Sequence, residues 1–250
     1  MDFTMTDKVA VVTGGSRGIG RAIALRFAES GAKVVIAGRD AETLATTEKE
    51  LWGVGCEAGT VQVDVGAPGA LNRIAASVLD RFGGVDVLVN NAYLSGGGMA
   101  LLDVTEDLWN RIFRVNVWAP FELARLVYPS MSERGGGSII NIASNEGIKS
   151  SGPGLGAYAT SKAAMIMLTR VCAIEWAKEN IRVNSIAPGL VRTDGAKRLI
   201  DHVQKTGQHF ARLERFAEPD EIAPLALYLA SSAGSFATGA CFVIDGGELA

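Results

Sequence analysis

Short runs of apolar and β-branched residues recur along the chain and alternate with segments of helical periodicity. Strands buried on both faces of a sheet have this nearly continuous apolar character. We expect strands at Lys8–Val12, Lys33–Ala37, Thr60–Asp64, Val85–Asn90, Ser138–Ser144, Ile181–Ala187 and Ala240–Asp245. Between the first two runs, Ile19, Ile23 and Phe27 recur four residues apart, as on one face of an amphipathic helix. The alternation predicts an α/β fold, a doubly wound parallel sheet of seven strands with helices on both faces.

The composition is that of a compact globular protein, with 48% hydrophobic and 20% charged residues. No linker, repeat or low-complexity tract divides the chain, so we expect one domain spanning residues 1–250. The net charge of −3 provides no basic excess for binding nucleic acid or an anionic membrane. The first residues do not resemble a signal peptide, and no apolar run approaches the ~20 residues of a membrane span, which predicts a cytoplasmic protein.

The cysteines and histidines form no pattern typical of a disulfide framework or a metal site. Cys56, Cys172 and Cys241 are scattered, odd in number and without a C-x-x-C pair, which fits a reducing compartment. His202 and His209 lie seven residues apart with no third ligand nearby. We therefore expect surface histidines and no bound metal.

A glycine-rich stretch, TGGSRGIG at Thr13–Gly20, follows the first expected strand and opens the first expected helix. Its spacing differs from G-x-G-x-x-G, but its place in a βαβ unit favours a dinucleotide site of the Rossmann type over a purely structural turn. Gly14 would form a tight turn, Gly18 would admit a pyrophosphate close to the backbone, and Gly20 would let the helix pack closely. The free N–H groups and the helix dipole then favour phosphate charge.

The end of the second expected strand bears on the choice of cofactor. Dinucleotide folds usually carry an acidic residue there, which binds the ribose hydroxyls. Here Gly38 takes that place and Arg39 follows. Loss of the carboxylate removes repulsion toward a 2′-phosphate, which a guanidinium can bind in a fork; Arg17 is a second candidate. We predict NADP(H), with NAD(H) as the alternative, since both arginines can be solvated and Asp40 can neutralise Arg39.

Residues at the ends of two further strands extend this site. Asp64 and Val65 close the third run and are expected to meet the adenine. Asn91 and Ala92, in an Asn-Asn-Ala sequence that closes the fourth run, are expected to border a cofactor ribose. Both expectations follow from the rule that open α/β sheets bind ligands at the carboxyl ends of their strands.

Taken together, the motifs resemble the short-chain dehydrogenase/reductase family. The matching features, in family order and spacing, are T-G-x-x-x-G-x-G at Thr13–Gly20, Asn90-Asn91-Ala92, Asn116, Ser144, Tyr158-x-x-x-Lys162, Pro188-Gly189 with Thr193, and Asp245-Gly246-Gly247. The resemblance runs from residue 8 almost to the C-terminus. It implies a nicotinamide-dependent oxidoreductase that interconverts a ketone or aldehyde with an alcohol. Among family members, the chain most resembles the 3-oxoacyl-thioester and carbonyl reductases.

The resemblance also implies a set of cofactor contacts. The Val191 backbone and the Thr193 hydroxyl would fix the nicotinamide carboxamide. The full set of residues expected to bind the cofactor is Gly14, Ser16, Arg17, Gly18, Ile19, Gly20, Arg39, Asp64, Val65, Asn91, Ala92, Tyr158, Lys162, Pro188, Gly189, Val191 and Thr193.

Tyr158 and Lys162 stand at i and i+4, so their side chains share one helix face. An isolated tyrosine has a pKa near ~10, too high for a base near neutrality. The ammonium and an oxidised nicotinamide would stabilise the phenolate, making Tyr158 the predicted general acid/base. Ser144 would hold the substrate oxygen. The family implies that Lys162 binds the nicotinamide ribose and that Asn116 holds a water feeding it protons.

Each of these residues also has a purely structural interpretation. Tyr158 and Lys162 can form a surface contact, Ser144 can end a strand, and Asn116 can satisfy a backbone group inside a helix. Their convergence at one sheet edge beside a phosphate loop favours catalysis. An NAD-dependent secondary alcohol dehydrogenase is the nearest alternative. A non-catalytic NADP(H)-sensing regulator is a further one, although it could dispense with the Tyr158–Lys162 pair.

One position departs from the family pattern, since Tyr93 stands where glycine usually follows Asn-Asn-Ala. The phenol can narrow the pocket, contact the substrate or point into the adjacent loop, which leaves the size of the substrate open. The substrate pocket is expected from Tyr93–Met99, Asn145–Gly156 and the segment from Asp194 to about Arg215. The last segment is a candidate lid that we predict loses order without cofactor.

The resemblance implies a homo-oligomer as well, because family members commonly form tetramers through helices that flank the sheet. An apolar face around Met165, Leu168 and Cys172 is a candidate for this contact, with the protein core as the alternative. The expected partners are thus a small carbonyl or alcohol substrate and further copies of the chain.

Overall fold

The computed structural model describes residues 2–150, 152–206 and 210–250 and contains a sheet of seven parallel strands. The strands are β1 (Val9–Thr13), β2 (Lys33–Gly38), β3 (Ala58–Gln62), β4 (Val87–Asn90), β5 (Gly137–Ile142), β6 (Ile181–Pro188) and β7 (Cys241–Ile244). Their order in the sheet is β3-β2-β1-β4-β5-β6-β7. The predicted doubly wound fold is therefore confirmed, and the strand order reverses between β1 and β4, which is where such sheets bind ligands.

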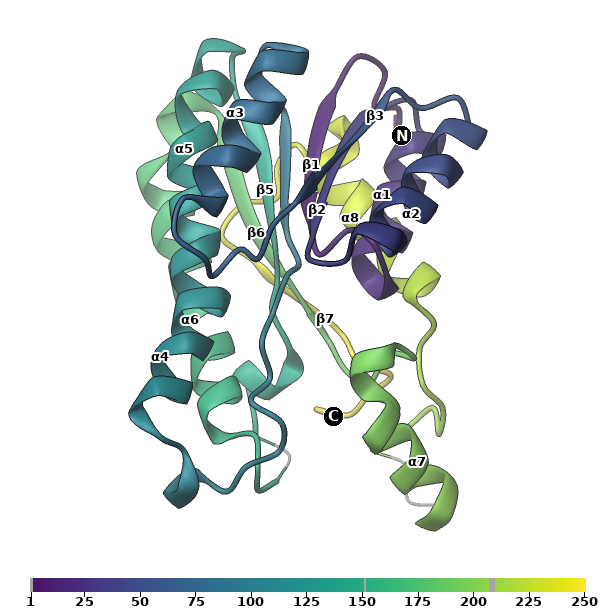
Figure 1. Ribbon diagram of the computed structural model, residues 1–250, viewed down its shortest axis with the longest axis vertical. Helices are drawn as coiled ribbons and strands as arrows, with labels where there is room; N and C mark the ends of the chain where they lie inside the picture. The colour runs from purple at the N-terminus through teal and green to yellow at the C-terminus, as the bar shows by residue number, and fades with distance from the viewer. Residues whose placement is uncertain (1, 151, 207–209) are drawn as a thin grey trace.

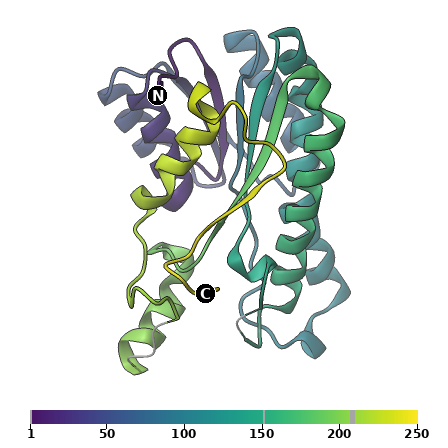
Figure 2. The ribbon, with the colours of Figure 1, turned by 180° about the vertical axis from the view of Figure 1, so that it is seen from behind.

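Helices cover both faces of the sheet (Figures 1 and 2). They are α1 (Gly18–Glu29), α2 (Ala41–Gly53), α3 (Ala70–Phe82), α4 (Glu106–Phe113), α5 (Ala119–Glu133), α6 (Gly156–Glu175), α7 (Lys197–Thr206) and α8 (Pro219–Ala230). Residues of α1, α2 and α8 share one large hydrophobic core, residues of α3, α5 and α6 share a second, and Met165 and Ile166 of α6 form a small third cluster with Ala143. Alternate residues of β1 supply the two cores: Ala10 and Val12 join the first, Val9 and Val11 the second.

Three strands end earlier than the sequence suggested, β7 by one residue and β3 and β5 by two. β3 ends at Gln62, so Asp64 lies beyond the strand. β5 ends at Ile142, and the Ser144 side chain instead caps a short 3₁₀ turn by accepting a hydrogen bond from the Glu146 N–H at 3.2 Å. The expected run was too long because Ala143 and Ser144 remain buried after the backbone leaves the sheet. Burial and strand pairing therefore end at different residues.

A π-helical turn, Arg114–Trp118, joins α4 to α5. Turns of this kind are rare and occur often at functional sites. Asn116 lies within it and is completely buried. Across the residues that the structure describes, no helix is long and apolar enough to span a membrane.

Candidate active site

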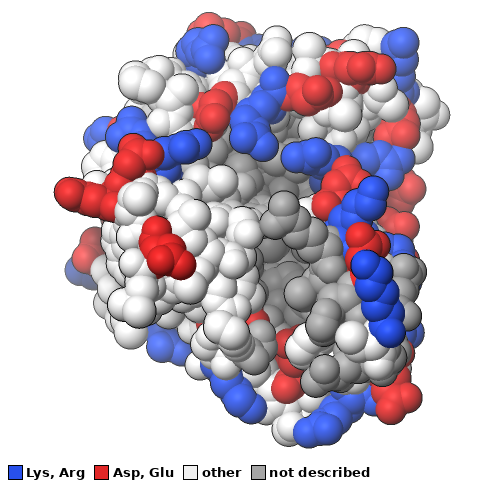
Figure 3. All heavy atoms as spheres, turned by 60° about the horizontal axis from the view of Figure 1, so that its bottom comes forward, with Lys and Arg blue, Asp and Glu red and all other residues white. Residues whose placement is uncertain are grey.

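The candidate site lies at the carboxyl ends of the central strands, at the lower edge of the sheet in Figure 1. The chain leaves β1 into the glycine loop, β4 into the Asn-Asn-Ala sequence, β5 into the Ser144 turn and β6 into Pro188-Gly189. Figure 3 views the molecule from this side and shows charged side chains of both signs intermixed. The topology thus brings the motifs of the four strands to one place.

Hydrogen bonds tie the glycine loop to the end of β4. The Thr13 hydroxyl accepts bonds from the Asn91 and Ala92 N–H groups at 3.0 and 3.1 Å. The Asn91 side-chain amide donates to the carbonyl oxygens of Thr13 and Gly14, both at 3.0 Å. A Cβ added at Gly14 would lie 2.8 Å from the Asn91 amide nitrogen, and the φ of Gly14 is 63°. Only glycine fits this turn, and Asn91 serves to hold it in place.

The beginning of α1 is suited to bind a pyrophosphate. Arg17 precedes the helix without a side-chain cap, and no acidic residue lies in the first turn. The N–H groups there are available to an anion, which the helix dipole favours. A Cβ at Gly20 would overlap the Gly14 carbonyl oxygen, while one at Gly18 would lie 3.0 Å from the Thr193 methyl group. Within the loop, the Ser16 side chain is buried, and its hydroxyl oxygen accepts a hydrogen bond from the Thr43 hydroxyl of α2 at 3.2 Å. The loop therefore fits the predicted cofactor.

Of the two arginines predicted to bind a ribose phosphate, Arg39 lies just before α2 and Arg17 just before α1. The Asp40 carboxylate caps α2 by accepting a bond from the Thr43 N–H at 2.8 Å, which lowers the pKa of Asp40. Arg39 is exposed beside it. Arg17 is also largely exposed and lies 3.9 Å from the Asp194 carboxylate, in the segment after β6. Both guanidinium groups are thus accessible to an added phosphate.

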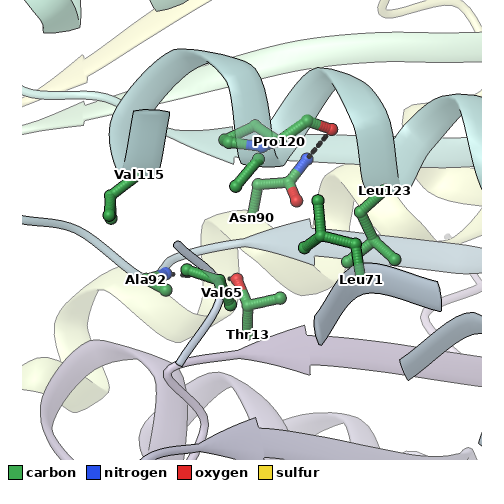
Figure 4. Close-up of a pocket in the computed structure, with 9 residues that line it drawn as sticks. Thr13, Val65, Leu71, Asn90, Ala92, Val115, Pro120 and Leu123 are labelled. Atoms are coloured by element: carbon green, nitrogen blue, oxygen red, sulfur yellow. Dashed lines mark hydrogen bonds between the residues drawn. The ribbon is translucent and has the colours of Figure 1, made fainter. Parts of the chain in front are cut away.

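A small cavity beside the glycine loop is lined by Val65 and Ala92, the residues expected to contact the adenine and a ribose (Figure 4). Val115, from the π-helical turn, forms another wall. Val115 was not among the expected site residues, because a single valine in a helix carries no motif. Asp64 is exposed nearby and accepts a bond from the Gly66 N–H at 2.9 Å.

Tyr158 and Lys162 lie on α6 beside Ser144. Lys162 is only 1% exposed, and its ammonium donates to the Ile142 carbonyl oxygen at 2.7 Å. Burial lowers the pKa of Lys162 to about 7. Burial also raises the pKa of the Tyr158 phenol, with the Ser144 hydroxyl acting in the opposite direction. The lowering of the Tyr158 pKa expected from the sequence is therefore not a property of the protein alone, because desolvation dominates before a cationic nicotinamide is present.

The Asn116 side chain links the loop after β4 to α6. Both of its amide hydrogens are used, one on the Leu94 carbonyl oxygen and one on the Ser161 hydroxyl, each at 2.9 Å. Its amide oxygen accepts the Leu94 N–H at 2.8 Å. The Asn116 amide nitrogen therefore has no hydrogen left for a water. A water held by Asn116 would instead donate a hydrogen bond to the side-chain or main-chain carbonyl oxygen of this residue.

The segment after β6 borders the site, where Thr193 contacts Gly18 of the glycine loop. Gly189 packs against Asp245, where an added Cβ would lie 2.8 Å from the Asp245 Cβ. Val191 pairs with Ala217 in a β-bridge. The predicted lid contains α7, while its residues 207–209, including His209, lie outside the described residues. Its loss of order without cofactor stays a prediction.

Two features of the site were not foreseen. Tyr93 turns its ring toward Tyr158 and Lys162, although the sequence left its direction open. Glu248 folds back beside Gly189, where burial raises the pKa of its carboxyl group. Its position after Asp245-Gly246-Gly247 was the only available signal. In the described part of the chain, no three His, Cys, Asp or Glu residues are grouped as a metal site would require.

Known proteins resemble this chain in sequence and in fold. A family model described as enoyl-(acyl carrier protein) reductase matches residues 14–248. Human dehydrogenase/reductase SDR family member 4 is 36% identical over 245 residues, which are 97% of this chain and 88% of that protein. The 3-oxoacyl-[acyl-carrier-protein] reductase FabG of Thermotoga maritima is 35% identical over 240 residues, 96% of this chain and 97% of the relative.

A solved structure matches over the entire chain. The L-sorbose reductase of Gluconobacter frateurii, complexed with NADPH and L-sorbose, superposes with a TM-score of 0.94 at 35% identity and covers 100% of this chain and 99% of that one. The chain therefore belongs to the short-chain dehydrogenase/reductase family, as its motifs predicted. It is an oxidoreductase of the class that interconverts carbonyl and alcohol groups with a nicotinamide cofactor.

Proposed function

We propose that the protein is an NADP(H)-dependent carbonyl reductase in which Tyr158 is the general acid and base. The observation that carries this proposal is the convergence of Tyr158, Lys162 and Ser144 at the sheet edge that also holds an uncapped helix N-terminus. The bound cofactor would supply the hydride in reduction and take it up in oxidation. Among substrates, a 3-oxoacyl group is one candidate, in keeping with the name of the Thermotoga maritima relative.

The side chains of the protein would transfer the proton that accompanies the hydride. In reduction, the Tyr158 hydroxyl donates its proton to the carbonyl oxygen, which the Ser144 hydroxyl holds by a second hydrogen bond. Lys162, with a pKa of about 7, exchanges protons near neutrality and stabilises the phenolate left on Tyr158. Its hydrogen bond to the Ile142 carbonyl oxygen holds the ammonium at the carboxyl end of β5. The same steps in reverse serve alcohol oxidation.

The direct test is a panel of ketones, aldehydes, 3-oxoacyl thioesters and sugars, assayed with NADPH and NADH through the loss of reduced-nicotinamide absorbance. We expect turnover of at least one carbonyl with NADPH. Cofactor binding without turnover of any carbonyl, unchanged in Tyr158→Phe, would instead favour the sensing regulator.

The preference for NADP(H) rests on Gly38 and the two exposed arginines, Arg39 and Arg17. We expect Gly38→Asp combined with Arg39→Ala to reverse the preference, because a carboxylate repels the 2′-phosphate and accepts ribose hydroxyls. The expected change in the ratio of kcat/KM for NADPH to that for NADH is on the order of 100-fold, or ~2.7 kcal/mol. Arg26→Ala removes an arginine from the last turn of α1, at the end of the helix away from the glycine loop, and is the control. A preference for NADH in the wild type, unaffected by Arg39→Ala, would support the alcohol dehydrogenase alternative.

We also propose a cytoplasmic homotetramer. Met165 and Cys172 belong to the core, so the face expected to mediate contacts does not serve that purpose. The outer face of α6 is a better candidate, because Met167, Val171 and Ile174 are exposed there, Ile174 by 79%. Light scattering is expected to give about four times the 26.2 kDa chain mass. Ile174→Lys is expected to reduce the mass, and a monomeric wild type would contradict the proposal.

A further inference from the structure

Tyr93 reaches from the end of β4 across the candidate site. Its ring meets the ring of Tyr158 edge-on, with the centroids 6.1 Å apart. The Lys162 ammonium lies over its face, 5.7 Å from the centroid. Its hydroxyl contacts Gly195, and a Cβ added at Gly195 would overlap that oxygen. One side chain therefore links the Tyr158–Lys162 pair to the segment that follows β6.

The nicotinamide half of the cofactor needs the same two partners under the proposed function, on which this inference rests. Lys162 would bind its ribose hydroxyls, and Val191 and Thr193 would bind its carboxamide. We propose that Tyr93 occupies the nicotinamide end of the cofactor site in the cofactor-free protein and rotates out when the cofactor binds. Tyr93 thus competes with the cofactor for Lys162.

The backbone on both sides of Tyr93 is fixed, so the movement is a rotation of its side chain. The Ala92 N–H is bound to Thr13, and both backbone groups of Leu94 are bound to the Asn116 amide. The side chain itself is free to leave, since Tyr93 is already 47% exposed. Aromatic and cation–π contacts hold it in place, and these are modest interactions. The cofactor has to break them before Lys162 can take its ribose.

Gly195 provides the space that the Tyr93 hydroxyl occupies. The phenol oxygen lies where any side chain at 195 would begin. The φ of Gly195 is not in the left-handed region, so the backbone there does not itself require glycine. The absence of a side chain at 195 thus gives Tyr93 room to rest across the site.

The test compares NADPH with adenosine 2′,5′-bisphosphate, which lacks the nicotinamide half, by isothermal titration calorimetry. Tyr93→Ala is expected to bind NADPH about tenfold more tightly, the equivalent of ~1.4 kcal/mol, and the bisphosphate as the wild type does. Tyr93→Phe keeps the ring and is expected to stay close to the wild type. Tyr128→Ala is the control, because Tyr128 packs against Trp176, with the two rings tilted by 57°, away from the site.

Equal or weaker binding of NADPH by Tyr93→Ala would overturn the inference, as would the same gain for both ligands, which would indicate a general change in the fold. These results leave the proposed function intact. If neither NADPH nor NADH binds to any of the proteins, the proposed function fails and this inference with it.

Discussion

Replacing Tyr158 with phenylalanine is expected to lower kcat by about 10²- to 10⁴-fold, the range that a positioned general acid or base contributes. Phenylalanine keeps the ring and its edge-on contact with Tyr93 but has no proton to donate. Affinity for NADPH is expected to change little, because the glycine loop and the remaining cofactor contacts are untouched. Steady-state kinetics and calorimetric titration of NADPH measure the two quantities.

Tyr128→Phe is the matched control, since it removes a hydroxyl from a tyrosine outside the site. Loss of NADPH binding together with activity would mean that Tyr158 builds the cofactor site and does not carry the proton. Full activity of Tyr158→Phe would remove Tyr158 from the mechanism.

Replacing Lys162 with methionine is expected to abolish most activity and yet stabilise the fold. The wild-type protein buries an ammonium without a carboxylate partner in the described structure, and its pKa falls from 10.5 to about 7. At ~1.4 kcal/mol per pKa unit, this burial costs several kcal/mol at neutral pH. Part of the gain is offset because the Ile142 carbonyl loses its hydrogen bond. We expect a net gain on the order of 2–4 kcal/mol in the free energy of unfolding at pH 7.

The gain from Lys162→Met has a defined pH dependence. Between pH 7 and 10.5 the unfolded chain holds the lysine proton and the folded protein has released it, so wild-type stability rises with pH. The advantage of the variant is therefore greatest at pH 7 and below and disappears as the pH approaches 10.5. Urea unfolding at several pH values measures it, with the exposed Lys178→Met as control. A constant difference, or a loss of stability at pH 7, would show that Lys162 is not buried as an uncompensated charge.

The seven strands and the meeting of the motifs at one edge follow from the sequence, because buried parallel strands are almost wholly apolar and ligand residues stand at their ends. The residues at which the strands end do not follow from the sequence. Ser144 lies beyond β5, and the sequence placed it inside the strand because residues stay buried after strand pairing stops. Asn116 was assigned from the family motif, but the π-helical turn that buries it leaves no periodic signal.

The sequence also did not predict the direction in which individual side chains point. Tyr93 rests against Tyr158 because Gly195, far along the chain, leaves space for its hydroxyl. Glu248 enters the site because the Asp245 carboxylate binds the N–H groups of Gly247 and Leu249, both at 2.9 Å, and turns the C-terminal segment inward. Such contacts depend on tertiary packing between distant residues, which no local pattern encodes.

A crystal structure with NADP⁺ bound would test the proposed proton transfer most directly, because it shows where the Tyr158 hydroxyl lies relative to the cofactor. We predict that the Tyr158 hydroxyl faces the nicotinamide C4, with the Lys162 ammonium on the ribose and the Tyr93 ring turned away. A Tyr158 hydroxyl directed away from the nicotinamide, with the Lys162 ammonium in solvent, would contradict the proposed mechanism.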